Sequence, residues 1–88
     1  MLQAVLLPKE PITLNPAQVD ELIKKLSTMR HDINGFVTVM QLSAELMRIS
    51  PETADARYRT LTDQQVRITE ALKTFSRELE TALGVARP

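Results

Sequence analysis

Hydrophobic residues recur at alternating spacings of three and four along two long stretches of the chain, the pattern of one face of an α-helix. In the first stretch the positions cover four heptads, with one polar member, and are Val19, Leu22, Leu26, Met29, Ile33, Phe36, Met40, Ser43 and Met47. In the second stretch they are Ala54, Tyr58, Leu61, Gln65, Ile68, Leu72, Phe75, Leu79 and Ala82. The pattern predicts two long helices that pack through these seams, as in a bundle or coiled coil.

Prolines and capping residues mark where the two helices begin and end. None of the five prolines falls inside either stretch; they are at positions 8, 11, 16, 51 and 88. Asn15 and Gln18 form an N-x-x-Q variant of the capping box, with Pro16 at the first helical position. This pattern predicts the start of the first helix. Ser50, followed by a proline, is the expected N-cap of the second helix, and Gly84 is its expected C-cap.

The short link between the two helices makes them antiparallel neighbours. A second apolar stripe widens the face of the first helix toward its C-terminal end and consists of Val39, Leu42, Leu46 and Ile49. These faces are wider than one hairpin can cover. We therefore expect an all-α fold, an antiparallel two-helix hairpin over residues 15–84 that dimerises into a four-helix bundle. An extended arm over residues 1–14 precedes it and a frayed tail over residues 85–88 follows it.

Charged residues spaced four apart occupy positions outside both seams. Such pairs stabilise a helix when the charges are opposite. The spacing predicts ion pairs on the outer surfaces of both helices, namely Asp20–Lys24, Glu21–Lys25, Asp55–Arg59 and Asp63–Arg67.

The composition of the 88 residues excludes several classes of function. Eleven Lys and Arg balance eleven Asp and Glu, which argues against a protein that binds nucleic acid by neutralising phosphates. The absence of cysteine excludes thiol catalysis and Cys-ligated zinc, and a single histidine cannot build a multi-histidine metal site. We expect no metal and no cofactor. The longest apolar run, residues 4–7, is too short for a membrane span or a signal peptide. We expect a cytoplasmic protein with neither a nucleic-acid nor a membrane partner.

The single histidine, His31, lies at the heptad position farthest from the first seam. Its helical neighbours are all small or polar: Ser27, Thr28, Asn34, Gly35 and Thr38. The imidazole is therefore expected to be exposed, with space for a partner to approach it. An imidazole nitrogen is a nucleophile that can form a covalent intermediate, for example in phosphoryl transfer. The simpler interpretation is a solvated surface histidine.

The segment around His31, M-R-H-D-I-N-G-F-V, resembles the phosphoacceptor box of two-component sensor histidine kinases in its H-D-[IL]-N-N variety. The resemblance continues through residues 38–47 and the following helix, and covers about residues 17–84. It implies a homodimeric four-helix bundle in which His31 accepts a phosphoryl group. Asp32 orients the His31 imidazole or accepts the proton of that imidazole. The implied partners are a second copy of the chain, a response-regulator receiver domain and a separate kinase ATP-binding domain. Residues Asn34, Gly35 and Thr38 are expected to contact these partners.

Two departures from that family qualify the resemblance. Gly35 stands where many members have Thr or Asn to position the water that dephosphorylates a receiver, and Phe36 stands where many have proline. The sequence also contains no ATP-binding domain after the hairpin, so we expect that the chain does not phosphorylate His31 by itself. It is then either an excised dimerisation domain or a stand-alone phosphotransfer protein. His31 and Gly35 also match the H-x-x-K-G spacing of monomeric histidine phosphotransfer domains, with Asn34 in place of Lys. The alternative function is a non-catalytic dimerisation or scaffold hairpin with a degenerate histidine box.

Overall fold

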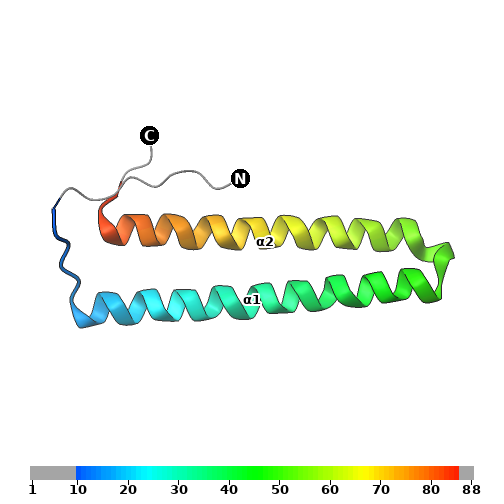
Figure 1. Cartoon of the computed structure of the whole chain (residues 1–88), viewed down its shortest axis with the longest axis horizontal. Coiled ribbons are helices and arrows are strands. Elements are labelled where there is room, and N and C mark those ends of the chain that lie inside the picture. The colour runs from blue at the N-terminus through cyan, green and yellow to red at the C-terminus, as the bar shows by residue number, and fades with distance from the viewer. Residues whose placement is uncertain (1–9, 86–88) are drawn as a thin grey trace.

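The computed structural model describes residues 10–85 and consists of two long helices joined by a short turn. The helices are α1 (Pro16–Ile49) and α2 (Ala54–Leu83), with a 3-10 turn, η1 (Pro51–Thr53), between them. They lie side by side and antiparallel (Figure 1). The described residues contain no strand, and the predicted all-α helical hairpin is confirmed. The predictions for most of the N-terminal arm, residues 1–9, and for residues 86–88 of the tail lie outside the described residues.

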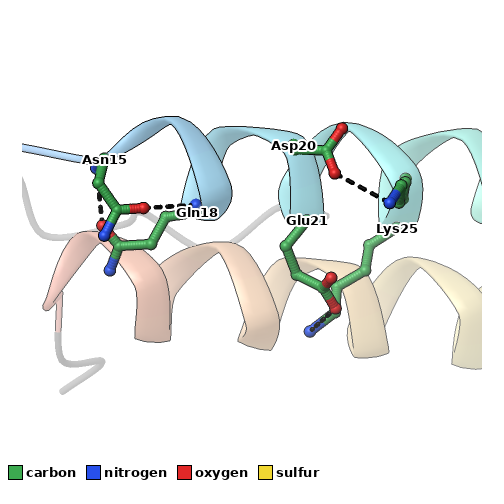
Figure 2. Close-up of polar contacts among 6 residues, drawn as sticks. Asn15, Gln18, Asp20, Glu21 and Lys25 are labelled. Atoms are coloured by element: carbon green, nitrogen blue, oxygen red, sulfur yellow. Dashed lines mark hydrogen bonds and ion pairs between the residues drawn. The ribbon is translucent and has the colours of Figure 1, made fainter.

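The first helix begins at the predicted capping box. The Asn15 Oδ1 accepts a hydrogen bond from the Gln18 backbone N–H at 2.8 Å, and the Gln18 Oε1 accepts one from the Asn15 N–H at 2.9 Å (Figure 2). These bonds satisfy backbone donors that a helix start would otherwise leave without a partner. One turn later the predicted pairs form, with Lys24 Nζ 2.9 Å from Asp20 Oδ2 and Lys25 Nζ 3.7 Å from Glu21 Oε1.

The turn between the helices differs from the prediction that Ser50 caps the second helix. The Ser50 side chain makes no capping bond. Its backbone N–H instead donates to the Leu46 carbonyl at 2.8 Å and ends α1. Its carbonyl accepts from both the N–H and the Oγ1 of Thr53, at 2.9 and 2.8 Å. Because these bonds close a 3-10 turn over Pro51–Thr53, α2 begins only at Ala54.

The second helix ends at Gly84, as predicted, in a Schellman motif. Gly84 has a φ of 68°, in the left-handed region that glycine adopts without strain. Its N–H donates to the Thr81 carbonyl at 3.2 Å, and the N–H of Val85 donates to the Glu80 carbonyl at 2.9 Å. Val85, the first residue of the expected tail, is therefore hydrogen-bonded to the end of the helix.

The two seams face each other only in part. Half-buried seam residues are Leu22, Met29, Ile33, Phe36, Met40 and Met47 in α1 and Ala54, Leu61, Ile68, Phe75, Leu79 and Ala82 in α2. The one polar member of the first seam, Ser43, is the most buried described residue, with 3% of its surface exposed. No described hydrophobic residue is fully buried.

The hairpin is a single layer of structure. It measures 57 × 28 × 12 Å, and its smallest dimension is about the diameter of one helix. Protein domains bury a hydrophobic core between at least two layers. Each helix here covers only one side of the other, so apolar side chains remain exposed on the broad faces of the hairpin.

Candidate functional site

The single histidine stands in the middle of α1 with its side chain exposed, as predicted. The helix runs without interruption through Gly35, which does not adopt a positive φ. A side chain at position 35 would meet nothing within 4 Å. Packing within the chain therefore does not require glycine at this position, which leaves the surface one turn beyond His31 open.

His31 lies at the edge of a shallow groove of about 410 Å³ between the two helices. Five residues of α1 and two of α2 form it: His31, Asp32, Gly35, Phe36, Val39, Gln64 and Arg67. The structure thus brings together three of the predicted site residues, His31, Asp32 and Gly35. The other two, Asn34 and Thr38, are exposed but do not line the groove. The Thr38 hydroxyl donates to the Asn34 carbonyl at 2.9 Å, a bond within the helix.

The spacing of residues within one helix does not predict the contribution of α2 to this site. It predicts that Arg67 pairs with Asp63, but neither this pair nor Asp55–Arg59 forms among the described residues. Arg67 lines the groove instead. The position of the turn could have revealed this, since residues equally distant from the turn of an antiparallel hairpin lie opposite each other. This rule places Arg67 opposite Phe36, one turn from Asp32.

The groove beside His31 continues along one side of the hairpin, from the middle of α1 to its start. A second hollow shares Asp32 with it and extends toward Glu78. A third shares Lys25 and Glu78 with the second and reaches the start of α1 at Asn15. We call this side the groove face; its charged residues are Glu21, Lys24, Lys25, Asp32, Arg67, Glu70, Arg77 and Glu78.

The opposite side of the hairpin carries five exposed apolar residues, interspersed with polar ones such as Arg30 and Gln65. At about 100° per residue, Val19, Leu26 and Val37 fall on one line along α1, about half a turn from the groove residues Glu21 and Thr28. In α2, Tyr58 and Leu72 lie about half a turn from the groove residues Arg67 and Thr74. We call this side the apolar face; its residues, 36–63% exposed, are Val19, Leu26, Val37, Tyr58 and Leu72.

The second apolar stripe of α1 lies on the groove side of the seam and not on the apolar face. Val39 lies in the groove with His31, and all four residues of the stripe are exposed. Leu42 follows His31 by eleven residues, which places it about 20° from His31 around the helix. The stripe therefore forms a separate apolar patch on the side of α1 that carries His31; its members are Val39, Leu42, Leu46 and Ile49.

The polar groups of the site have no partner among the residues that the structure describes. His31, Asp32 and Arg67 make neither an ion pair nor a side-chain hydrogen bond within residues 10–85. Over the same residues there is no cluster of three or more metal-ligating side chains. A nucleophilic imidazole, a carboxylate and a guanidinium are thus placed together and left available to a molecule from outside.

Comparisons of the chain with known proteins add no assignment. Models of protein families give no match, and neither curated proteins nor solved structures match the chain significantly. None of the helices in the described part is long and apolar enough to cross a membrane. The groove at His31 and the sequence around it are therefore the features that bear on function.

Proposed function

We propose that the chain is the dimerisation and histidine-phosphotransfer module of a two-component phosphorelay. In this function His31 accepts a phosphoryl group and passes it to an aspartate of a receiver domain. The observation that carries the proposal is the position of His31, exposed on α1 at the edge of a groove that also holds Asp32 and Arg67. Phosphoryl transfer depends mainly on positioning and on charge around the phosphoryl oxygens, and these side chains supply both.

The transfer requires a donor outside the chain. The donor is either the aspartyl phosphate of a receiver or a nucleoside triphosphate bound to a separate kinase domain. A lone pair of the His31 imidazole forms the N–P bond while the P–O bond of the donor breaks, and the electron pair of that bond leaves with the carboxylate or the nucleoside diphosphate. The ring proton then passes to Asp32 or to water. Onward transfer to a receiver aspartate reverses these roles.

The apolar face supports dimerisation with a second copy. The five side chains of the apolar face are 36–63% exposed in the single chain. A standard interface buries about 800 Å² on each partner, and a second copy can cover these side chains. At about 25 cal/mol per Å² of apolar surface, pairing two apolar faces is strongly favourable. Such a dimer adds the second layer that the hairpin lacks and forms a four-helix bundle with both groove faces outward.

The side of α1 that carries His31 supports docking of a receiver domain. The apolar patch of Val39, Leu42, Leu46 and Ile49 extends from the groove toward the turn. Apolar residues at the centre of an interface, with charged groups around them, are typical of protein–protein contacts. Gly35 lies between His31 and this patch and has no side chain, so a partner backbone can approach the helix there.

A scaffold function is the second candidate. The apolar face favours it independently of His31, because pairing of two copies requires none of the groove residues. A dimerisation scaffold would hold two attached or bound partners together and would leave His31 as a solvated side chain. The two candidates differ in whether His31 is chemically required.

The experiment that separates them is phosphorylation of the purified chain. It is incubated with candidate kinase domains and ATP, and separately with phosphorylated receiver domains, and acid-labile phosphate is located by mass spectrometry. We expect label on His31 and none in the His31→Gln variant. Label elsewhere, or no label from any donor by a protein that is dimeric and helical, would support the scaffold instead.

A further inference from the structure

We infer that Arg67 and Gln64 of α2 hold the phosphoryl group that His31 accepts, so that both helices form the phosphoryl site of each protomer. The inference rests on the proposed function and adds two residues to it. It identifies Arg67 and Gln64 as positioning residues, which act on the transferred group and not as nucleophile or base.

Arg67 and Gln64 are placed where they can reach a group bound to His31. Arg67 and Gln64 lie three residues apart on one face of α2, and both line the groove that His31 borders. Arg67 contributes the only Lys or Arg side chain to that groove. A phosphoryl group on the imidazole therefore has one guanidinium to meet across the groove, carried on a separate rigid helix.

The Arg67 guanidinium is unpaired within the part of the chain that the structure describes. Asp63 stands four residues before it, at a spacing that favours an ion pair, yet the pair does not form. The described residues give the Arg67 guanidinium no other hydrogen-bond or ion-pair partner. The unmodified His31 side chain offers Arg67 no negative charge. A phosphoryl group on His31 offers it three oxygens that share a negative charge.

The chemistry of the two side chains fits that ligand. A guanidinium presents paired N–H donors that match two phosphoryl oxygens, and its charge offsets the charge of the group. The Gln64 amide adds a neutral N–H donor. During transfer the three equatorial oxygens carry the charge while the P–O bond of the donor breaks and the N–P bond to His31 forms. Arg67 stabilises this arrangement and its phosphohistidine product.

The test loads His31 chemically, so that it needs no biological partner. Phosphoramidate, a small donor that phosphorylates exposed imidazoles, is applied to the wild type and to the variants Arg67→Gln, Arg67→Lys and Arg59→Gln. Arg59 is the matched control, an exposed arginine of α2 that does not line the groove. The ³¹P resonance of the phosphohistidine is then followed against pH. Circular dichroism checks that each variant keeps its helices.

A nearby cation favours the doubly charged phosphoryl group and lowers the pH at which it gains a proton. We expect the titration midpoint to rise by about half a pH unit or more in Arg67→Gln. It should remain close to the wild-type value in Arg59→Gln and rise less in Arg67→Lys. Equal midpoints in the wild type and in Arg67→Gln would overturn the inference, and so would a folded wild type whose His31 phosphoramidate does not phosphorylate.

A second measurement separates this inference from the proposed function. The rate of phosphoryl transfer from a receiver to His31 is measured in the same variants, and Arg67→Gln should slow it at least tenfold, with partial rescue by Lys. If no receiver or kinase exchanges phosphate with His31 but the midpoint still depends on Arg67, the proposed function fails while the phosphoryl site stands. If exchange occurs at the wild-type rate in Arg67→Gln, the function stands and the role of Arg67 is refuted.

Discussion

Lys25 of α1 and Glu78 of α2 form a salt bridge across the hairpin, with 3.7 Å between the Lys25 Nζ and the Glu78 Oε1. The same ammonium lies 3.7 Å from the Glu21 Oε1 of its own helix. Within residues 10–85 it is the one ion pair that joins the two helices. The pair marks the register of the hairpin, the same register that places Arg67 opposite Phe36 beside the groove at His31.

This salt bridge is expected to mark the register without stabilising it much. Both side chains are more than a third exposed, so water and salt screen their attraction. A double-mutant cycle with Lys25→Ala and Glu78→Ala should give a coupling free energy below about 1 kcal/mol that falls as salt is added. A larger, salt-independent coupling would show that the pair is a main determinant of helix pairing.

The chain is expected to be a dimer through its apolar face. Light scattering at micromolar concentration should give twice the mass of the chain. Val37→Asp places a charge in the apolar face and should shift the protein to a monomer with reduced helicity. The matched control is Val66→Asp, because Val66 is 55% exposed on the outer side of α2 and should tolerate the charge. A stable, well-folded wild-type monomer would contradict the dimer.

Replacement of His31 is expected to remove phosphorylation and leave the fold unchanged. The side chain is exposed and makes no hydrogen bond to a described residue, and substitutions at such positions change the free energy of unfolding by less than about 0.5 kcal/mol. His31→Gln should therefore melt within a few degrees of the wild type. A large loss of stability would indicate that the histidine is structural.

Adding a methyl group at Gly35 is expected to stabilise the protein. Glycine inside a helix costs about 1 kcal/mol relative to alanine, and an added Cβ would meet nothing within 4 Å. Gly35→Ala should raise the free energy of unfolding by about that amount in chemical denaturation. If the same variant also binds or phosphorylates more slowly, the glycine is kept for a partner. A destabilised Gly35→Ala would show that some contact of the dimer occupies this space.

The protein is expected to stimulate dephosphorylation of a receiver poorly. In the family that the sequence resembles, that reaction uses a side chain at the position of Gly35 to hold water in line with the aspartyl phosphate. Asn34 lies about 100° away around the helix and does not line the groove. Decay of a phosphorylated receiver should be slow with the wild type and faster with Gly35→Asn.

The His31→Gln background excludes back-transfer in this assay. Rapid decay with wild-type protein that persists in His31→Gln would show that some other group positions the water. Forward transfer to a receiver does not use a water held at position 35, so the wild type should transfer phosphate even though it stimulates dephosphorylation poorly.

Features of this protein that depend on neighbouring residues can be read from the amino-acid sequence. The capping box of Asn15 and Gln18, the exposure of His31 and the left-handed end at Gly84 all follow from groups within a turn or two of each other. An α-helix gives such groups nearly the same geometry wherever it occurs. The alternating apolar spacing then predicts two helices, and the short link makes them antiparallel.

The packing of the two helices sets which side of each helix is covered and which residues meet at His31. Ser43, a polar exception in the seam, is the most buried described residue, whereas the seam residues Val19 and Tyr58 remain exposed. Arg67 faces the groove and not Asp63. These outcomes depend on how far each helix is rotated about its axis and on the register between the helices. Many weak contacts between residues distant in the sequence set both, and the spacing within one helix does not report them.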